Sequence, residues 1–315
     1  MRVFLAGAGG VIGRRLLPLL LAAGHEVTGT TRSPARLEQL RAMGAEAVLV
    51  DALDAAAMRA AVLDARPEAV IDQLTSIPAR INPRTVERDF ALNDRLRGEG
   101  TRILVDAALA AGAGRLLAQS IAFSYAPGPP GTLHREQDPL LAPDAAPRPY
   151  RRSAGAVQAL ERAVLDARGV VLRYGYFYGP GSAISRAGSM GQDLARRRLP
   201  IVGAGTGVWS LVHIDDAARA TLAALEREGP RVYNIVDDEP APVSQWLPAL
   251  ASAIGAPRPR RVPALLARPL AGSYGVAIMT RAQGASNELA RRELGWAPAH
   301  TSWRDGFRNG LDSQL

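Results

Sequence analysis

The chain has 315 residues, of which 47% are hydrophobic and 22% charged, and its net charge at neutral pH is +8. It contains no cysteine, which excludes disulfides, thiolate nucleophiles and cysteine-ligated metals. No apolar run approaches the ~18 residues of a membrane span. The first residues enter an apolar strand without the pattern of a signal peptide. We therefore expect a globular, cytoplasmic protein that binds no membrane.

The positive charge comes from arginine alone, because the 38 basic residues include no lysine. Most of these arginines are scattered over helix faces, and only 196–198 and 258–261 form clusters. A nucleic-acid interface needs basic residues concentrated on one face. The composition therefore predicts no nucleic-acid partner and is typical of coding bias.

The first half of the chain alternates short apolar runs with helical patterns. The strands are expected at Arg2–Ala6, Glu26–Thr30, Ala47–Val50, Ala69–Asp72, Arg115–Gln119 and Val170–Tyr174. The helices are expected at Val11–Ala23, Ser33–Met43 (with Ser33 as N-cap), Ala55–Asp64, Arg84–Ala111 and Tyr150–Ala167. Alternation of this kind predicts an α/β fold, a Rossmann-like, doubly wound parallel sheet.

After Pro180 the pattern loosens. A strand at Arg231–Val236 mixes with helices at Asp215–Leu225, Ser244–Ile254 and Ser286–Leu294. We interpret residues 1–180 as a dinucleotide-binding domain. Residues 181–315 are expected to form a small C-terminal α/β lobe that binds the substrate, interleaved with the first domain through a shared core.

The stretch "GAGGVIG" follows the first strand directly and opens the first helix. Its glycines, Gly7, Gly9, Gly10 and Gly13, allow a tight turn and a close approach of backbone to a diphosphate. The N–H groups of Val11 and Ile12, at the start of the helix, would face the phosphate charge. This context predicts a dinucleotide site.

The end of the second strand selects the dinucleotide. Sites for NAD place an acidic residue there, on the ribose 2′-hydroxyl. This chain has Thr30, Thr31 and Arg32 instead, followed by Arg36. A guanidinium pairs with a 2′-phosphate, so we expect NADP(H) rather than NAD(H) as the cofactor.

Further segments resemble the extended short-chain dehydrogenase/reductase family of the NAD-dependent epimerase/dehydratase type, over nearly the whole length. They are "VDALD", "VIDQLTS", "ALNDRLRGEGTRILVDAALAAG", "RYGYFYGPG", "WSLVHIDDAARATLAAL" and "ELGWAPAHTSWRDGF". The resemblance implies additional cofactor contacts at Asp51, Ala52, Leu74, Thr75, Asn93, Tyr174, Gly175 and Tyr176. It also implies a homodimer formed by the two long helices.

The same resemblance implies a catalytic set. In the family, a Ser or Thr follows the fifth strand and a Tyr-x-x-x-Lys motif opens the next helix. Ser120 and Tyr150 stand at the first two positions, but Ala154 occupies the position of the lysine.

The missing lysine limits the chemistry of Tyr150. A free tyrosine has a pKa near 10, so without a neighbouring cation Tyr150 stays protonated at neutral pH. It can donate a proton in a reduction but is a poor base for an oxidation. Tyr125, Tyr176, Tyr178 and His213 are alternative proton donors, although each is also expected in packing or buried hydrogen bonding.

The remaining residues suggest no other class of site. Four dispersed histidines without cysteine predict no metal centre, and no Gly-x-Ser-x-Gly elbow indicates a hydrolase. We expect an NADP(H)-dependent oxidoreductase, favouring a carbonyl or double-bond reductase, that acts on a small organic molecule resembling a sugar nucleotide or a secondary metabolite. The residues expected around the substrate are Ser76, Tyr178, Trp209, His213 and Arg281, with Trp246 and Tyr274 in an apolar wall.

Two alternatives stay open at this point. One is an NADP-binding sensor that has lost catalysis, and the other is an epimerase, dehydratase, isomerase or cyclase that reuses the pocket.

Overall fold

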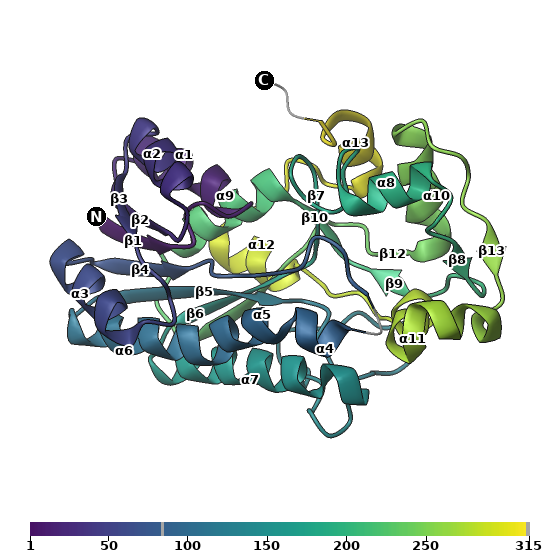
Figure 1. Cartoon of the computed structure of the whole chain (residues 1–315), viewed down its shortest axis with the longest axis horizontal. Coiled ribbons are helices and arrows are strands. Elements are labelled where there is room, and N and C mark those ends of the chain that lie inside the picture. Colours follow the sequence, from purple (N-terminus) through teal and green to yellow (C-terminus); the bar gives the residue numbers. More distant parts are fainter. Residues whose placement is uncertain (83–84, 313–315) are drawn as a thin grey trace.

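A computed structural model describes residues 1–82 and 85–312, except for the side chain of Leu270. A parallel sheet of seven strands crosses the molecule in the order β11-β6-β5-β4-β1-β2-β3 (Figure 1). The strands are β1 (Arg2–Ala6), β2 (Glu26–Thr31), β3 (Glu46–Leu49), β4 (Ala69–Asp72), β5 (Arg115–Ile121), β6 (Val170–Tyr174) and β11 (Arg231–Ile235). The predicted Rossmann-like α/β fold is confirmed.

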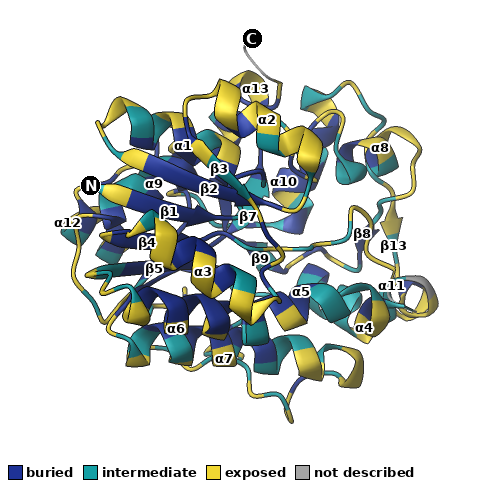
Figure 2. Ribbon diagram, turned by 60° about the vertical axis from the view of Figure 1, so that its left-hand side comes forward, coloured by how far each residue is buried: buried dark blue, intermediate teal, exposed yellow. Residues whose placement is uncertain are grey.

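Helices cover both faces of this sheet. One face packs on α1 (Gly13–Ala22), α2 (Pro34–Ala42), α9 (Ile214–Ala224) and α12 (Glu288–Leu294), and the other on α3 (Ala55–Ala65), α6 (Thr101–Ala110) and α7 (Arg151–Asp166). Alternate residues of a strand point into the hydrophobic cores on opposite faces of the sheet: Leu5 packs toward α1, whereas Phe4 packs toward α3. The inner strands are therefore largely buried, whereas the edge strand β3 is partly exposed. The outer faces of the helices are exposed (Figure 2).

The long helix expected at Arg84–Ala111 is interrupted. Its expected start at Arg84 lies outside the described residues. The described part consists of α4 (Val86–Asp89), α5 (Ala91–Arg95), a π-helical segment (Leu96–Gly100) and α6. A π-helical turn locally offsets the helix face by one residue, which periodicity alone does not reveal.

The second part of the chain builds three two-stranded sheets beside the carboxyl edge of the main sheet. β7 (Tyr176–Tyr178) pairs with β10 (Leu211–His213), β9 (Val208–Trp209) with β12 (Ala241–Pro242), and β8 (Ile201–Val202) with β13 (Arg261–Val262). They pack with α8 (Ser189–Ala195), α10 (Val243–Ala253), α11 (Ala264–Thr280) and α13 (Trp303–Asn309) around a separate hydrophobic core.

The boundary at residue 180 does not separate the elements cleanly. The strand expected within the C-terminal lobe, β11, is an edge strand of the main sheet and pairs in parallel with β6. Helix α9 returns with it and packs on α1. The chain therefore leaves the main sheet after β6, re-enters it at β11 and leaves again, and the division into two domains stays a prediction. No helix within residues 1–82 and 85–312 is long and apolar enough to cross a membrane.

Candidate functional site

The glycine turn lies at the carboxyl edge of the sheet, between β1 and α1. Gly7 has a φ of +81°, and a Cβ added there would lie 2.6 Å from the carbonyl oxygen of Gln73. A Cβ added to Gly13 would lie 2.5 Å from the carbonyl oxygen of Gly7. The turn is closed by a hydrogen bond of 2.9 Å from the Gly10 N–H to the Gly7 carbonyl. Only glycine fits at Gly7 and Gly13, because a Cβ there would collide with backbone.

Above this turn lies a groove of about 350 Å³. It crosses the ends of β1, β2 and β4, where the strand order of the sheet reverses direction, which is the position of ligand sites in open α/β sheets. Its lining contains the predicted cofactor residues Gly7, Gly9, Gly10, Arg32, Arg36, Ala52, Leu74 and Thr75. It also contains Thr30, Thr31, Ser33, Val50, Gln73 and Leu96.

Two arginines border one end of the groove. Arg32 follows β2 directly, and Arg36 lies on α2, where its Cδ would be 3.0 Å from a Cβ added to Gly9. Both side chains are exposed, and neither pairs with a carboxylate in the described part of the chain. Ser33 is the N-cap residue of α2 as expected, but its side chain makes no capping bond. This end of the groove therefore presents two free cations to a ligand.

Other predicted cofactor residues lie outside the groove lining. Asp51 is exposed and its carboxylate accepts from the Leu53 N–H. Val11 precedes α1, Ile12 is its N-cap residue and Gly13 is its first residue. Asn93 is fully buried, and its Oδ1 accepts from the Ser76 N–H at 3.1 Å. Asn93 thereby holds the loop after β4 at the edge of the groove, and its own contact with a cofactor stays a prediction.

The strand end beneath this loop carries a buried acid that no sequence motif indicated. Asp72 accepts hydrogen bonds from the Leu74 N–H (2.9 Å) and the Thr101 hydroxyl (2.8 Å). Burial raises the pKa of Asp72 to about 6, although both hydrogen bonds and the nearby Arg97 act against the rise. By accepting from the Leu74 N–H, the Asp72 carboxylate holds the backbone turn that places Leu74 in the lining of the groove.

Tyr150 stands at the N-terminal end of α7, at the same carboxyl edge of the sheet. Its ring packs on that of Tyr274 from α11, with centroids 3.9 Å apart and planes inclined by 31°. Burial, and then the neighbouring Tyr274, raise the pKa of Tyr150 to about 12. Ala154 follows one turn along the helix, and no cation in the described residues acts on the phenol. Tyr150 therefore holds its proton at neutral pH.

The hydroxyl of Ser120 is engaged inside the protein. It donates to Glu161 Oε1 at 2.6 Å. Glu161 also receives two hydrogen bonds from Arg173, at 2.9 and 2.7 Å. Both of its carboxylate oxygens are therefore engaged. Ser120 belongs to this buried network, and a role of its hydroxyl on a substrate stays a prediction that the geometry does not favour.

The remaining tyrosines of the predicted site divide into two groups. The hydroxyls of Tyr125 and Tyr174 are used inside the protein: Tyr125 donates to Asn234 at 2.6 Å, and Tyr174 bonds Thr221 at 2.7 Å. Tyr178 is buried in the core of the second part of the chain, packed edge-on against Phe307. Tyr176 belongs to the aromatic surface near Tyr150, as Tyr274 does. The backbone of Gly175, just before Tyr176, is buried against Ser210.

An aromatic wall faces the end of α7. Tyr176 is stacked between Phe123 (centroids 4.1 Å apart) and Trp209 (3.9 Å), and Trp209 packs on Trp246. Phe123 comes two residues after β5, and no motif indicated it. Arg281, proposed as an anion anchor, is exposed at the end of α11 and contacts none of these rings in the described residues.

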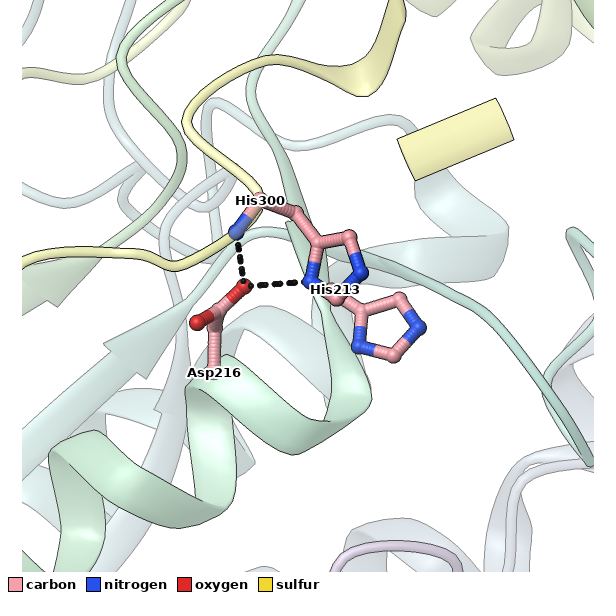
Figure 3. A group of neighbouring side chains, drawn as sticks. All are labelled: His213, Asp216 and His300. Atoms are coloured by element: carbon pink, nitrogen blue, oxygen red, sulfur yellow. Dashed lines mark hydrogen bonds and ion pairs between the residues drawn. The ribbon is translucent and has the colours of Figure 1, made fainter. Parts of the chain in front are cut away.

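His213, Asp216 and His300 form a compact group (Figure 3). The Nδ1 atom of His213 accepts from the Asp215 N–H and its Nε2 bonds the Gly310 carbonyl. Asp216 accepts from the Ala299 and His300 N–H groups and from the His300 ring, and it also pairs with Arg219. These bonds occupy both ring nitrogens of His213, the Nδ1 atom of His300 and both carboxylate oxygens of Asp216. The group clamps the start of α9 to residues 299–310 and leaves His213 no ring nitrogen for a substrate.

The chain is similar to known reductases along nearly its whole length. The profile of the NAD-dependent epimerase/dehydratase family matches residues 3–236. A 3-diazoavenalumate denitrifying reductase from a Streptomyces species is 46% identical over 98% of this chain and 99% of its own. A 2-alkyl-3-oxoalkanoate reductase from Stenotrophomonas maltophilia is 26% identical over 98% of both chains.

Solved structures of the same architecture cover nearly the whole chain. A UDP-glucose 4-epimerase from Thermotoga maritima, solved with UDP-glucose, has a TM-score of 0.78 at 21% identity, covering 99% of this chain and 97% of its own. A dTDP-glucose 4,6-dehydratase from Streptomyces venezuelae, solved with NAD, has a TM-score of 0.77 at 21% identity, covering 99% and 96%. At this level of identity the likeness shows the fold.

Proposed function

Because the chain belongs to the NAD-dependent epimerase/dehydratase family and is an oxidoreductase of the extended short-chain dehydrogenase/reductase type, we propose that it is an NADPH-dependent reductase of a small aromatic substrate. The observation that carries the direction of the reaction is the environment of Tyr150. Its phenol is kept protonated by burial and has alanine where the family places lysine. A permanently protonated phenol donates a proton but does not remove one.

The groove fits a dinucleotide. The turn is packed so closely that a Cβ at Gly7 or Gly13 would collide with neighbouring backbone, and such a glycine turn before a helix lets a diphosphate approach the N–H groups at the helix start. Arg32 and Arg36 would hold a 2′-phosphate on the adenosine ribose, since β2 ends without a carboxylate. When bound, the reduced nicotinamide supplies a hydride. Tyr150 and the aromatic wall lie on the side of β5 and β6, where the second half of a dinucleotide is expected.

We propose an aromatic diazo compound as the substrate class. Support comes from the Streptomyces relative, whose name describes a denitrifying reductase of a diazo compound and which matches the chain from end to end. Replacing the diazo group of a neutral diazo arene by hydrogen consumes one hydride and one proton and releases dinitrogen, so the change needs a proton donor and no base. The aromatic stack of Phe123, Tyr176 and Trp209 offers apolar surface that suits an aromatic ring.

The test is an assay of NADPH oxidation and of dinitrogen release with an aromatic diazo acid. We expect one equivalent of each, and at least tenfold lower activity with NADH than with NADPH, because a charge-assisted contact to the 2′-phosphate contributes about 1.5–3 kcal/mol. NADPH binding without oxidation, over a panel of diazo compounds and ketones, would instead favour the regulatory alternative. Isomerised product without net NADPH oxidation would favour the epimerase alternative.

We further propose that the protein is a cytoplasmic homodimer. The absence of cysteine suits a reducing compartment, and the outer face of α6 exposes Leu109 beside α7. Light scattering after gel filtration tests the assembly: a mass of twice 33.4 kDa is expected, and the mass of a single chain would contradict it.

A further inference from the structure

Three phenols come together beside the end of α7, from three separate parts of the chain. Tyr150 is at the start of α7, Tyr176 opens β7, and Tyr274 lies within α11. The ring of Tyr274 lies on that of Tyr150. It also acts electrostatically on the hydroxyls of both Tyr150 and Tyr176. Tyr274 is thus the member that joins the other two.

The three hydroxyls are available for a ligand. None of them makes a hydrogen bond to any residue that the structure describes, although the three side chains are only partly exposed. Burial raises the pKa of each phenol, and that of Tyr150 reaches about 12. All three are therefore hydrogen-bond donors at neutral pH.

Within the described residues, none of the three phenols pairs with a charged side chain. No carboxylate or guanidinium among the described residues shifts the pKa of Tyr150, Tyr176 or Tyr274. A phosphate or carboxylate group is recognised by arginine or lysine, but the arginines nearest to Tyr150 in sequence, Arg148, Arg151 and Arg152, are exposed and act on none of the three hydroxyls. A substrate ring that carries an oxygen needs hydrogen-bond donors and an apolar surface, and the partly exposed Phe123, stacked on Tyr176, supplies apolar surface beside the phenols.

Tyr274 is held in place by the second half of α11. The Trp209 indole donates to the Ile278 carbonyl at 2.9 Å, and the Gly207 N–H donates to the Met279 carbonyl at 3.0 Å. Gly272, with φ +69° and ψ 170°, breaks the helix two residues before Tyr274. This break separates Tyr274 from the exposed first turn of the helix, so its position depends on β9.

We propose that Tyr274, with Tyr150 and Tyr176, forms a three-phenol subsite that binds the oxygen substituent on the aromatic ring of a hydroxyaryl substrate. The proposal rests on the proposed function, whose substrate class it narrows to aromatic rings that carry an oxygen. In a ring with an oxygen next to a diazo group, the oxygen is negative and the diazo nitrogen positive. Reduction adds one hydride and one proton and releases dinitrogen, with the proton ending on the oxygen. Donors placed on that oxygen stabilise the charge and supply the proton.

Isothermal titration of the NADP⁺-loaded protein with 4-hydroxycinnamate and with cinnamate tests the subsite without turnover. The two probes differ only by one hydroxyl group on the aromatic ring. We expect the wild type to bind 4-hydroxycinnamate about tenfold more tightly, equivalent to about 1.4 kcal/mol. In Tyr274→Phe, which keeps the ring, this preference should fall to less than about threefold, while the affinity for cinnamate stays unchanged.

The matched control is Tyr233→Phe. Tyr233 lies on β11 of the main sheet, away from the subsite, and its hydroxyl donates to Glu293. This variant should retain the preference. Tyr176→Phe is a second test if Tyr274→Phe fails to fold. Equal affinity of the wild type for both probes, or an unchanged preference in both Tyr274→Phe and Tyr176→Phe, would overturn the proposal. Absence of NADPH oxidation with diazo arenes would refute the proposed function while leaving the binding preference intact.

Discussion

The hydroxyl of Ser120 lies 2.6 Å from a carboxylate oxygen of Glu161, and both side chains are buried. The family resemblance gives Ser120 the task of orienting a substrate oxygen. The structure instead uses its hydroxyl to satisfy a carboxylate that is already paired with Arg173. The geometry therefore predicts that Ser120 stabilises the fold.

Ser120→Ala should lower the free energy of unfolding by about 1.5–3 kcal/mol, because it removes a hydrogen bond to a buried charged group. Turnover of the folded enzyme should change by less than about threefold. Denaturant unfolding and steady-state assays measure the two effects. A loss of activity of about 10²-fold or more with unchanged stability would restore the catalytic role.

Gly7→Ala should abolish cofactor binding, because the new Cβ would lie 2.6 Å from the Gln73 carbonyl oxygen. Gly24→Ala is the matched control: Gly24 has nearly the same φ, +80°, but nothing within 4 Å of the added atom. The control isolates backbone strain, which is expected to cost about 1 kcal/mol. Fluorescence titration with NADPH compares the variants, and equal affinities would show that the turn does not contact the cofactor.

Arg32→Ala and Arg36→Ala should each weaken NADPH binding by about tenfold or more and leave NADH binding within about threefold, since only the 2′-phosphate distinguishes the two. Arg41→Ala is the control, because Arg41 lies on the same helix and pairs with Glu38. Titration with both nucleotides measures the ratio of dissociation constants. Parallel losses for NADPH and NADH would contradict a contact to the 2′-phosphate.

The high pKa of Tyr150 predicts a flat pH dependence for reduction. The protonated acid is lost only as pH rises through about 12, so Tyr150 imposes no decline between about pH 6 and 10. Ala154→Lys should place a cation one turn from the phenol and lower its pKa. The decline in reduction then moves to lower pH, and oxidation of an alcohol becomes measurable.

The control for this added charge is Ala159→Lys, on the exposed face of α7, which should leave both pH profiles unchanged. Profiles of kcat for Ala154→Lys that match the wild type would show that Tyr150 is not the proton donor.

The hydrogen bonds of Asp216 predict that the stability of the fold falls in acid and does not depend on a metal. Burial alone would raise the pKa of Asp216, but hydrogen bonds from His300 and Ala299 and the charge of Arg219 outweigh it and lower the pKa to about 2. The stability from this depressed pKa, on the order of 2 kcal/mol, is present above pH ~4 and is lost as pH falls toward 2. Asp216→Asn should remove that part of the pH dependence of unfolding. Chelators should leave the melting temperature unchanged, and a lower one would indicate a bound metal.

Sequence reasoning succeeded where neighbours along the chain determine the structure. The alternation of apolar runs and helices predicts the parallel sheet, and the Gly7 turn is recognisable because its strand, glycines and helix are adjacent in sequence. Ala154, which stands where the family has lysine, is only four residues from Tyr150, so the sequence alone already indicated that Tyr150 stays protonated.

Other features depend on contacts between distant segments, and only the tertiary structure decided them. Ser120 meets Glu161 because β5 and α7 pack together, and Tyr274 reaches Tyr150 because β9 holds α11 across the site. β11 joins the main sheet because its backbone satisfies the N–H and C=O groups that β6 would otherwise leave unpaired at the edge. Local patterns specify which elements form, since they reflect nearby backbone geometry. Which side chains meet at the carboxyl edge is set by the packing of surfaces that lie far apart along the chain.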